Sequence, residues 1–184
     1  RFGFVRERRF QIQEVIRLAG MHVIINDLDQ PLIIKVASLP GERLQVYFID
    51  NNEYFNRKAY YTDENGAFFE DNDERAVFFA RGVIETIKKL NWVPDIIHFS
   101  GWMASFIPIY LKNFYKKDYY FSNTKLVMSV YNEPEVVFNE KIEEVLAFDK
   151  IKNLKALEYN KSQYFVGDAM ELVDVVVKGD EFLE

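Results

Sequence analysis

The sequence predicts an α/β domain of the Rossmann-like, three-layer kind, with a mostly parallel sheet and a β-hairpin. An apolar strand over 95–99 is followed by a helical stretch over 102–115 and a second apolar strand over 126–130, which is the spacing of a parallel βαβ unit. Three earlier runs have the composition of strands separated by short turns, over 21–26, 31–38 and 43–50. So short a turn between strands favours a hairpin inserted in the sheet or at its edge.

The composition is that of one globular domain. The 184 residues suffice for a hydrophobic core, and 49% of them are hydrophobic. The net charge of −6 argues against a nucleic acid partner, because such binding depends on neutralising phosphates. There is no cysteine, which is compatible with the cytoplasmic location that we expect. No apolar run approaches the roughly 20 residues that a membrane helix needs, so no membrane partner is expected.

The clearest helix is predicted over 71–90, with Asp71 and Glu74 placed to form a capping box. Its apolar residues lie on one face at helical spacing: Ala76, Phe79, Val83, Ile87 and Leu90. Shorter helices are expected over 139–147, 151–158 and 162–171, and a last buried strand over 172–177.

Three segments are less regular. The basic segment 1–10 is expected to be a loop, and 11–18 either a short helical turn or an irregular approach to a strand. The polar and aromatic stretch 51–70 is either a functional or mobile loop, or a surface loop fixed by its aromatic side chains.

The turn after strand 95–99 is the first candidate for a site, because α/β sheets bind ligands at the carboxyl ends of parallel strands. For Ser100, a helix cap is favoured over a nucleophile, because its neighbours do not form a G-x-S-x-G elbow. His98 shares a strand face with Ser100. It is either a core histidine bonded to a backbone carbonyl or an imidazole that faces a ligand.

Other chemistries find little support in the sequence. There is no glycine-rich phosphate loop, and the two histidines have no carboxylate spaced to join them, so no metal and no cofactor are predicted. Arg57 and Arg75 could each hold an anion, but surface ion pairs are favoured for both.

Four segments together resemble the bacterial glycogen synthases and the plant starch synthases. They are YFIDNNEYFNR at 47–57, DNDERAVFF at 71–79, WVPDIIHFSGW at 92–102 and SVYN at 129–132. The corresponding family runs are YFIDNPEYFDR, DNxERFxxF, WxPDIIHxHDW and a strand that ends in a His-Asn dipeptide. The order and spacing of these runs match over most of the chain.

This resemblance implies a GT-B glycosyltransferase, in which two Rossmann-like domains face each other across a cleft. Such an enzyme moves glucose from ADP-glucose or UDP-glucose to the non-reducing end of an α-1,4-glucan, with retention of configuration and without a metal. Residues 1–184 would form the acceptor-side domain, incomplete at both ends, and would not catalyse transfer alone. The implied partners are the glucan and the sugar nucleotide, and an uncovered apolar face would favour self-association of the chain.

The resemblance also implies the residues of the cleft. His98 and Tyr131 are the candidate catalytic residues, and Trp102 and Asn132 are candidate substrate-binding residues. A loop near the glucan is expected to consist of Asp50, Asn51, Tyr54, Phe55 and Arg57. Their roles would be positioning and hydrogen bonding.

The chain departs from the family at three of these positions. Ser100 stands where the family has a histidine, Gly101 where it has an aspartate, and Tyr131 where it has the histidine of the His-Asn pair. Glycine supplies no carboxylate, whereas a tyrosine hydroxyl can still donate a hydrogen bond. Two alternatives therefore stay open: a GT-B transferase with another acceptor, and a non-catalytic relative that binds glucan.

Overall fold

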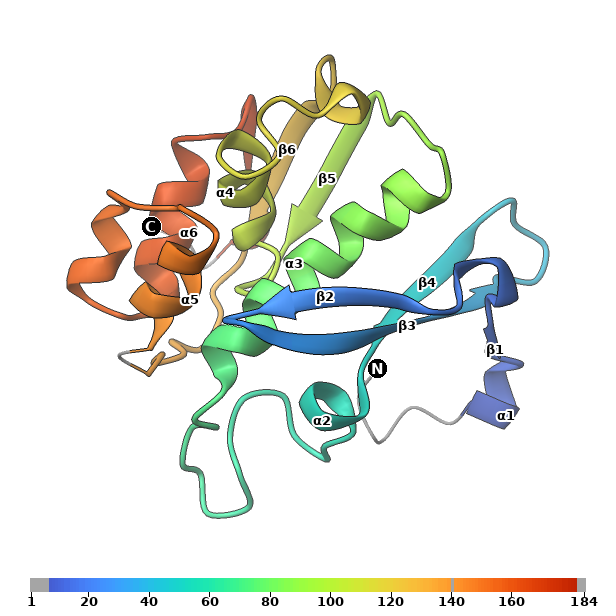
Figure 1. Cartoon of the computed structure of the whole chain (residues 1–184), viewed down its shortest axis with the longest axis horizontal. Helices are drawn as coiled ribbons and strands as arrows, with labels where there is room; N and C mark the ends of the chain where they lie inside the picture. Colours follow the sequence, from blue (N-terminus) through green and yellow to red (C-terminus); the bar gives the residue numbers. More distant parts are fainter. Residues whose placement is uncertain (1–6, 140, 182–184) are drawn as a thin grey trace.

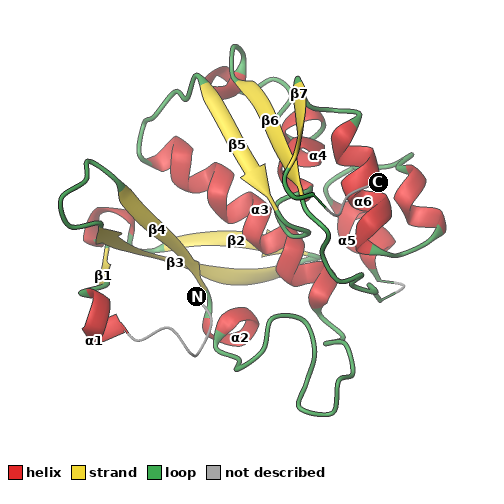
Figure 2. Cartoon of the chain, turned by 180° about the vertical axis from the view of Figure 1, so that it is seen from behind, coloured by secondary structure: helices red, strands yellow, loops and turns green. Residues whose placement is uncertain are grey.

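The computed structural model describes residues 7–139 and 141–181, which fold into two sheets with helices packed between and beside them (Figures 1 and 2). The antiparallel sheet consists of β1 (Gln13–Glu14), β2 (Met21–Ile25), β3 (Leu28–Ser38) and β4 (Gln45–Asp50). The parallel sheet consists of β5 (Ile96–Ser100), β6 (Lys125–Val130) and β7 (Val175–Lys178), in that order. The predicted α/β class is confirmed, but the hairpin forms a sheet of its own and does not join the parallel one.

The hairpin of β2 and β3 turns through Asn26 and Asp27, whose φ angles are 45° and 65°. Positive φ at both central residues is the geometry of a two-residue hairpin turn, and Asn and Asp tolerate it. Strand β3 therefore begins at Leu28, earlier than predicted, and is long enough to pair with β1, β2 and β4.

Helix α3 (Asn72–Lys89) lies between the antiparallel sheet and the layer that contains α4 and α5 (Figure 2). Because the helix is covered from both sides, its buried residues extend beyond one apolar face and include Val77, Phe78 and Ile84. Gly82 permits the closest contact with the sheet, since a Cβ atom there would lie 2.8 Å from Cγ2 of Ile49.

The predicted capping box of α3 is not formed. The carboxylate of Asp71 binds the guanidinium group of Arg57. The backbone N–H of Glu74 donates instead to Asp73 Oδ1 at 2.8 Å. A nearby cation therefore replaces the backbone amides as the partner of Asp71.

The crossover from β5 to β6 passes through α4 (Phe106–Lys112), which begins later than the predicted Trp102. Residues 101–105 form a turn instead, in which Gly101 has a φ of 91° and the hydroxyl of Ser105 donates to the carbonyl of Trp102 at 2.6 Å. The ring of Phe106 stacks on Phe165 of α6 at 4.9 Å between centroids.

The remaining elements are short. They are α1 (Glu7–Phe10), α2 (Asn52–Phe55), α5 (Ile142–Phe148) and α6 (Ser162–Met170), with 3-10 turns at Ile16–Leu18, Tyr119–Phe121 and Lys155–Glu158. The prediction of a loop over 1–10 is wrong at Glu7–Phe10, which form α1. Residues 1–6 lie outside the described residues. Segment 11–18 contains both a strand and a helical turn.

Strand β7 is exposed at all four of its residues, so the prediction of a buried last strand is also wrong. Among the described strands it pairs only with β6, so it forms one edge of the parallel sheet. None of the helices in the described part of the chain has the length and apolar character that crossing a membrane requires.

Candidate functional site

Two neighbouring cavities open at the carboxyl ends of β5 and β6, where a parallel sheet is expected to bind ligands. The first has a volume of about 230 Å³ and the second about 430 Å³. Gly101, Trp102 and Glu133 line both of them and therefore mark the boundary between the two.

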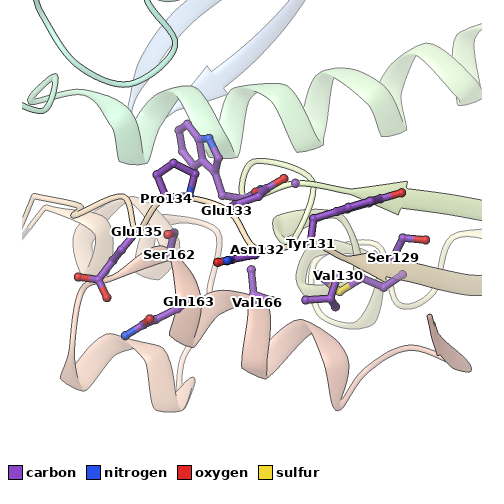
Figure 3. Close-up of a pocket in the computed structure, with 13 residues that line it drawn as sticks. Ser129, Val130, Tyr131, Asn132, Glu133, Pro134, Glu135, Ser162, Gln163 and Val166 are labelled. Carbon is purple, nitrogen blue, oxygen red and sulfur yellow. The ribbon is translucent and has the colours of Figure 1, made fainter. Parts of the chain in front are cut away.

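The first cavity lies between the loop after β6 and helix α6, and Figure 3 shows its lining residues. Tyr131 and Asn132 contribute from the loop, whereas Gln163 and Val166 contribute from the helix. Trp102 closes the cavity from the turn after β5. The structure thus brings together three of the predicted site residues, Trp102, Tyr131 and Asn132.

The segment after β7 fixes the two loop residues. A Cβ atom on Gly179 would lie 2.7 Å from ring carbons of Tyr131, so only glycine allows this close contact. Asp180 Oδ2 accepts a hydrogen bond from the backbone N–H of Asn132 at 2.7 Å. The segment after β7 therefore helps to position the loop of a site that it does not itself line.

The second cavity has an aromatic wall. It lies between β4, helix α3 and the turn after β5, and its aromatic lining consists of Tyr47, Phe48, Phe55, Tyr60, Phe79 and Trp102. Ser100 and Glu133 add polar groups to this wall. An aromatic surface with a few polar groups is typical of ligand sites, and sugar rings stack on such surfaces.

Glu133 joins the two strand ends. Its Oε2 atom accepts a hydrogen bond from the backbone N–H of Trp102 at 3.1 Å, and its Oε1 atom lies 3.5 Å from the position of a Cβ atom on Gly101. Sequence reasoning did not select Glu133; the available signal was an acidic residue directly after the predicted Asn132.

His98 is exposed, and its Nε2 atom lies 2.8 Å from the hydroxyl oxygen of Ser129 on β6. The alternative of a core histidine bonded to a backbone carbonyl is therefore wrong. Ser129 lines the first cavity but His98 does not, so the imidazole reaches the site through this hydroxyl. Ser100 ends β5, and because α4 begins at Phe106, the predicted helix cap at Ser100 is also wrong.

The predicted glucan loop is held mainly by internal contacts. Asp50 is fully buried and pairs with Lys35 at 2.9 Å. The side chain of Asn51 caps α2 by accepting hydrogen bonds from two backbone amides, at 2.9 and 3.0 Å. The buried hydroxyl of Tyr54 donates to Glu74, and burial raises the pKa of this tyrosine. These three residues support the loop, and their contact with a ligand stays a prediction.

Two other members of the loop differ from these three. Phe55 is buried but reaches the wall of the second cavity. Arg57 pairs with Asp71 and lies over the ring of Phe69 at 4.5 Å, as expected for an ion-paired arginine. The loop is therefore fixed by ion pairs and a helix cap as well as by aromatic side chains, and any contact of Arg57 with a ligand stays a prediction.

The favoured surface ion pair for Arg75 is wrong. The side chain is fully buried and donates to the carbonyl of Tyr54 at 2.8 Å and to the side chain of Asn72. Burial lowers the pKa of Arg75 to about 10. This arginine ties α3 to α2 and does not face a ligand.

The arrangement suits a neutral, hydroxyl-rich ligand. The strand ends offer a phenol, an amide and a carboxylate as hydrogen-bonding groups, and the adjoining wall is aromatic. Within residues 7–139 and 141–181, no three histidine, aspartate or glutamate side chains are grouped as a metal site requires.

Known proteins are similar to this chain in sequence. Residues 1–179 match the family model of the starch synthase catalytic domain. A glycogen synthase of Chlorobium limicola is 34% identical over 174 residues, which are 94% of this chain and 34% of that protein. A glycogen synthase of Chlorobium luteolum is 37% identical over 133 residues, covering 72% of this chain and 27% of that protein.

A solved structure resembles the fold. The catalytic domain of starch synthase IV from Arabidopsis thaliana, bound to ADP and acarbose, has a TM-score of 0.66, with 15% identity over 90% of this chain and 33% of that one. At this identity the likeness concerns the fold alone. The chain spans about a third of the length of the relatives that it matches.

Proposed function

Because this chain belongs to the family of the starch synthase catalytic domain, we propose that it functions in a glycogen synthase-like glucosyltransferase. The enzyme transfers glucose from ADP-glucose or UDP-glucose to the non-reducing end of an α-1,4-glucan, with retention of configuration. The proposal places the enzyme in the cytoplasm. The observation that carries it is the family match along nearly the whole chain.

Within this proposal, the chain holds the glucan acceptor. The aromatic wall of the second cavity packs against sugar rings, and Trp102 extends that wall towards the first cavity. Tyr131 and Asn132 hydrogen-bond sugar hydroxyls at the end of β6, and His98 positions the hydroxyl of Ser129. These groups orient the acceptor, which lowers the entropic part of the barrier to transfer. The remaining length of the relatives would provide the sugar-nucleotide half.

The test is incorporation of labelled glucose into glycogen by the full-length protein, with ADP-glucose and UDP-glucose as separate donors. We expect incorporation from at least one donor, and none from the 184-residue chain alone. Replacing Trp102 by alanine is expected to raise the KM for glucan at least tenfold, because the side chain lines both cavities. Absence of incorporation from both donors by the full-length protein would overturn the synthase proposal.

A second candidate function is non-catalytic glucan binding, favoured by Gly101 and Tyr131 in place of an acid and an imidazole. This alternative predicts that the full-length protein binds maltoheptaose, measured by isothermal titration calorimetry, but incorporates no glucose. A transferase with another acceptor would instead consume the sugar nucleotide only when a different polysaccharide is supplied.

A further inference from the structure

We propose that Glu133 supplies the carboxylate of this cleft and accepts hydrogen bonds from hydroxyl groups of the acceptor glucan. The inference rests on the proposed function and names a group that binds the acceptor. Glu133 lines both cavities, so a ligand that extends from one cavity into the other lies beside its carboxylate.

The position of the carboxylate is set by two contacts. Glu133 lies on the loop after β6, yet its Oε2 atom accepts the backbone N–H of Trp102 in the turn after β5. Its Oε1 atom lies 3.5 Å, and its Oε2 atom 3.9 Å, from the position of a Cβ atom on Gly101. An aspartate at position 101 would direct its carboxylate into the same space.

Gly101 keeps this space free. Its φ of 91° lies in the left-handed region, which glycine adopts readily and other residues only under strain. Of the residues that the structure describes, only Glu133 and the chain neighbours of Gly101 lie within 4 Å of this Cβ position. The turn after β5 therefore has no side chain at position 101, and the carboxylate at this place is that of Glu133 from the loop after β6.

The chemistry of the ligand follows from the charge. Among the described residues, no lysine, arginine or histidine forms an ion pair with Glu133, so none of the described cations neutralises its charge. A carboxylate oxygen has two acceptor positions, and Trp102 uses one of those available on Oε2. An unneutralised carboxylate repels phosphate but forms strong hydrogen bonds with neutral hydroxyls. Glu133 therefore suits the hydroxyl groups of the glucan, which carries no phosphate, better than the diphosphate of the sugar nucleotide.

The experiment measures steady-state glucosyl transfer by the full-length protein, with glucan and sugar nucleotide varied separately. Glu133→Gln keeps the shape but removes the charge, and we expect kcat/KM for glucan to fall at least tenfold while the KM for the nucleotide stays within twofold. The matched control is Glu171→Gln, which changes an exposed carboxylate paired with Lys155 and is expected to leave both parameters unchanged.

A rescue variant separates binding from a structural role. Glu133→Ala and Gly101→Asp are each expected to lower kcat/KM for glucan, the second because it adds strain and a repelling charge beside Glu133. The combination Gly101→Asp with Glu133→Ala returns a carboxylate to the same space and is expected to recover at least threefold over Glu133→Ala.

The outcomes distinguish the two proposals. An active wild type in which Glu133→Gln retains more than half of kcat/KM for glucan would overturn the role of Glu133 and leave the synthase proposal standing. Equal losses for both substrates, a lowered melting temperature and no rescue by Gly101→Asp would reduce Glu133 to a structural residue and overturn the inference. An inactive wild type would overturn the synthase proposal and the inference with it.

Discussion

Arg81 and Asp149 form a buried ion pair that joins four parts of the fold. The Nη1 atom of Arg81 lies 3.1 and 3.2 Å from the two carboxylate oxygens and also donates to the carbonyl of Ile24 on β2. The hydroxyl of Tyr110 on α4 donates to the same carboxylate at 2.7 Å. The two charged residues are 8% and 7% exposed, so solvent screens neither of them well.

Replacing Arg81 by methionine is expected to lower the free energy of unfolding by about 3–5 kcal/mol, because Asp149 would remain buried without its cation. Burial already raises the pKa of Asp149, and loss of the guanidinium raises it further. The protonated acid needs no cation, so the destabilisation is expected to shrink as the pH falls through this raised pKa.

The assay is urea unfolding followed by circular dichroism for Arg81→Met, Asp149→Leu and the double variant. The double variant is expected to lose at least about 2 kcal/mol less than the sum of the single variants, since no isolated charge remains buried. Lys125→Met is the control, because it breaks an exposed pair with Asp174 and should cost less than about 1 kcal/mol. Additive single effects, or a loss below 1 kcal/mol for Arg81→Met, would refute the reasoning.

Two further predictions concern the buried residues Asp73 and Gly82 of α3. Burial raises the pKa of Asp73 to about 6. The pKa of this carboxyl in the unfolded chain is near 4, so between about pH 4 and 6 the folded state binds more protons and becomes more stable as the pH falls. Asp73→Asn should therefore raise the free energy of unfolding by up to about 3 kcal/mol at pH 8 and by little at pH 4, as measured by thermal melts. Gly82→Ala should lower the melting temperature, because the new Cβ would lie 2.8 Å from Ile49, whereas Gly167→Ala, which meets no atom within 4 Å, should raise it. Superimposable pH profiles, or equal responses of the two glycines, would contradict these expectations.

Local pattern was sufficient to predict most strands. The apolar runs around β2, β4, β5 and β6 are short and bounded by turn residues, so their existence did not depend on distant contacts. The separate antiparallel sheet could not be predicted in this way. This sheet packs on α3 through the close contact of Gly82 with Ile49. These two residues are far apart in the sequence, so no local pattern reveals their contact.

The family resemblance selected Trp102, Tyr131 and Asn132 as site residues. The structure places them near the ends of two parallel neighbours, which meet at one edge of the sheet, and their contact with a ligand stays a prediction. Glu133 was missed because its contact with Trp102 spans 31 residues of sequence. In the sequence, its carboxylate cannot be told apart from a solvated surface charge.

Asp50, Asn51 and Tyr54 belong to a recognisable motif, and the contacts that the structure shows for them support the fold. Their side chains pair a buried lysine, cap a short helix and bond a glutamate of α3. A motif shared with an enzyme family identifies the residues that matter but does not separate those that contact a ligand from those that hold its surroundings.

The position of α3 between the two layers determines how the aromatic cavity can respond to a ligand. Strand β4 and helix α4, which follows the turn after β5, both pack against the same 18-residue helix, so the two walls cannot separate without disturbing that packing. Under the proposed function, a sugar chain entering the cavity would meet a rigid template, and the protein would lose little conformational entropy on binding. Differences between acceptors of different length or linkage should then arise in how fast they leave the surface, while the rate at which they find it stays nearly constant.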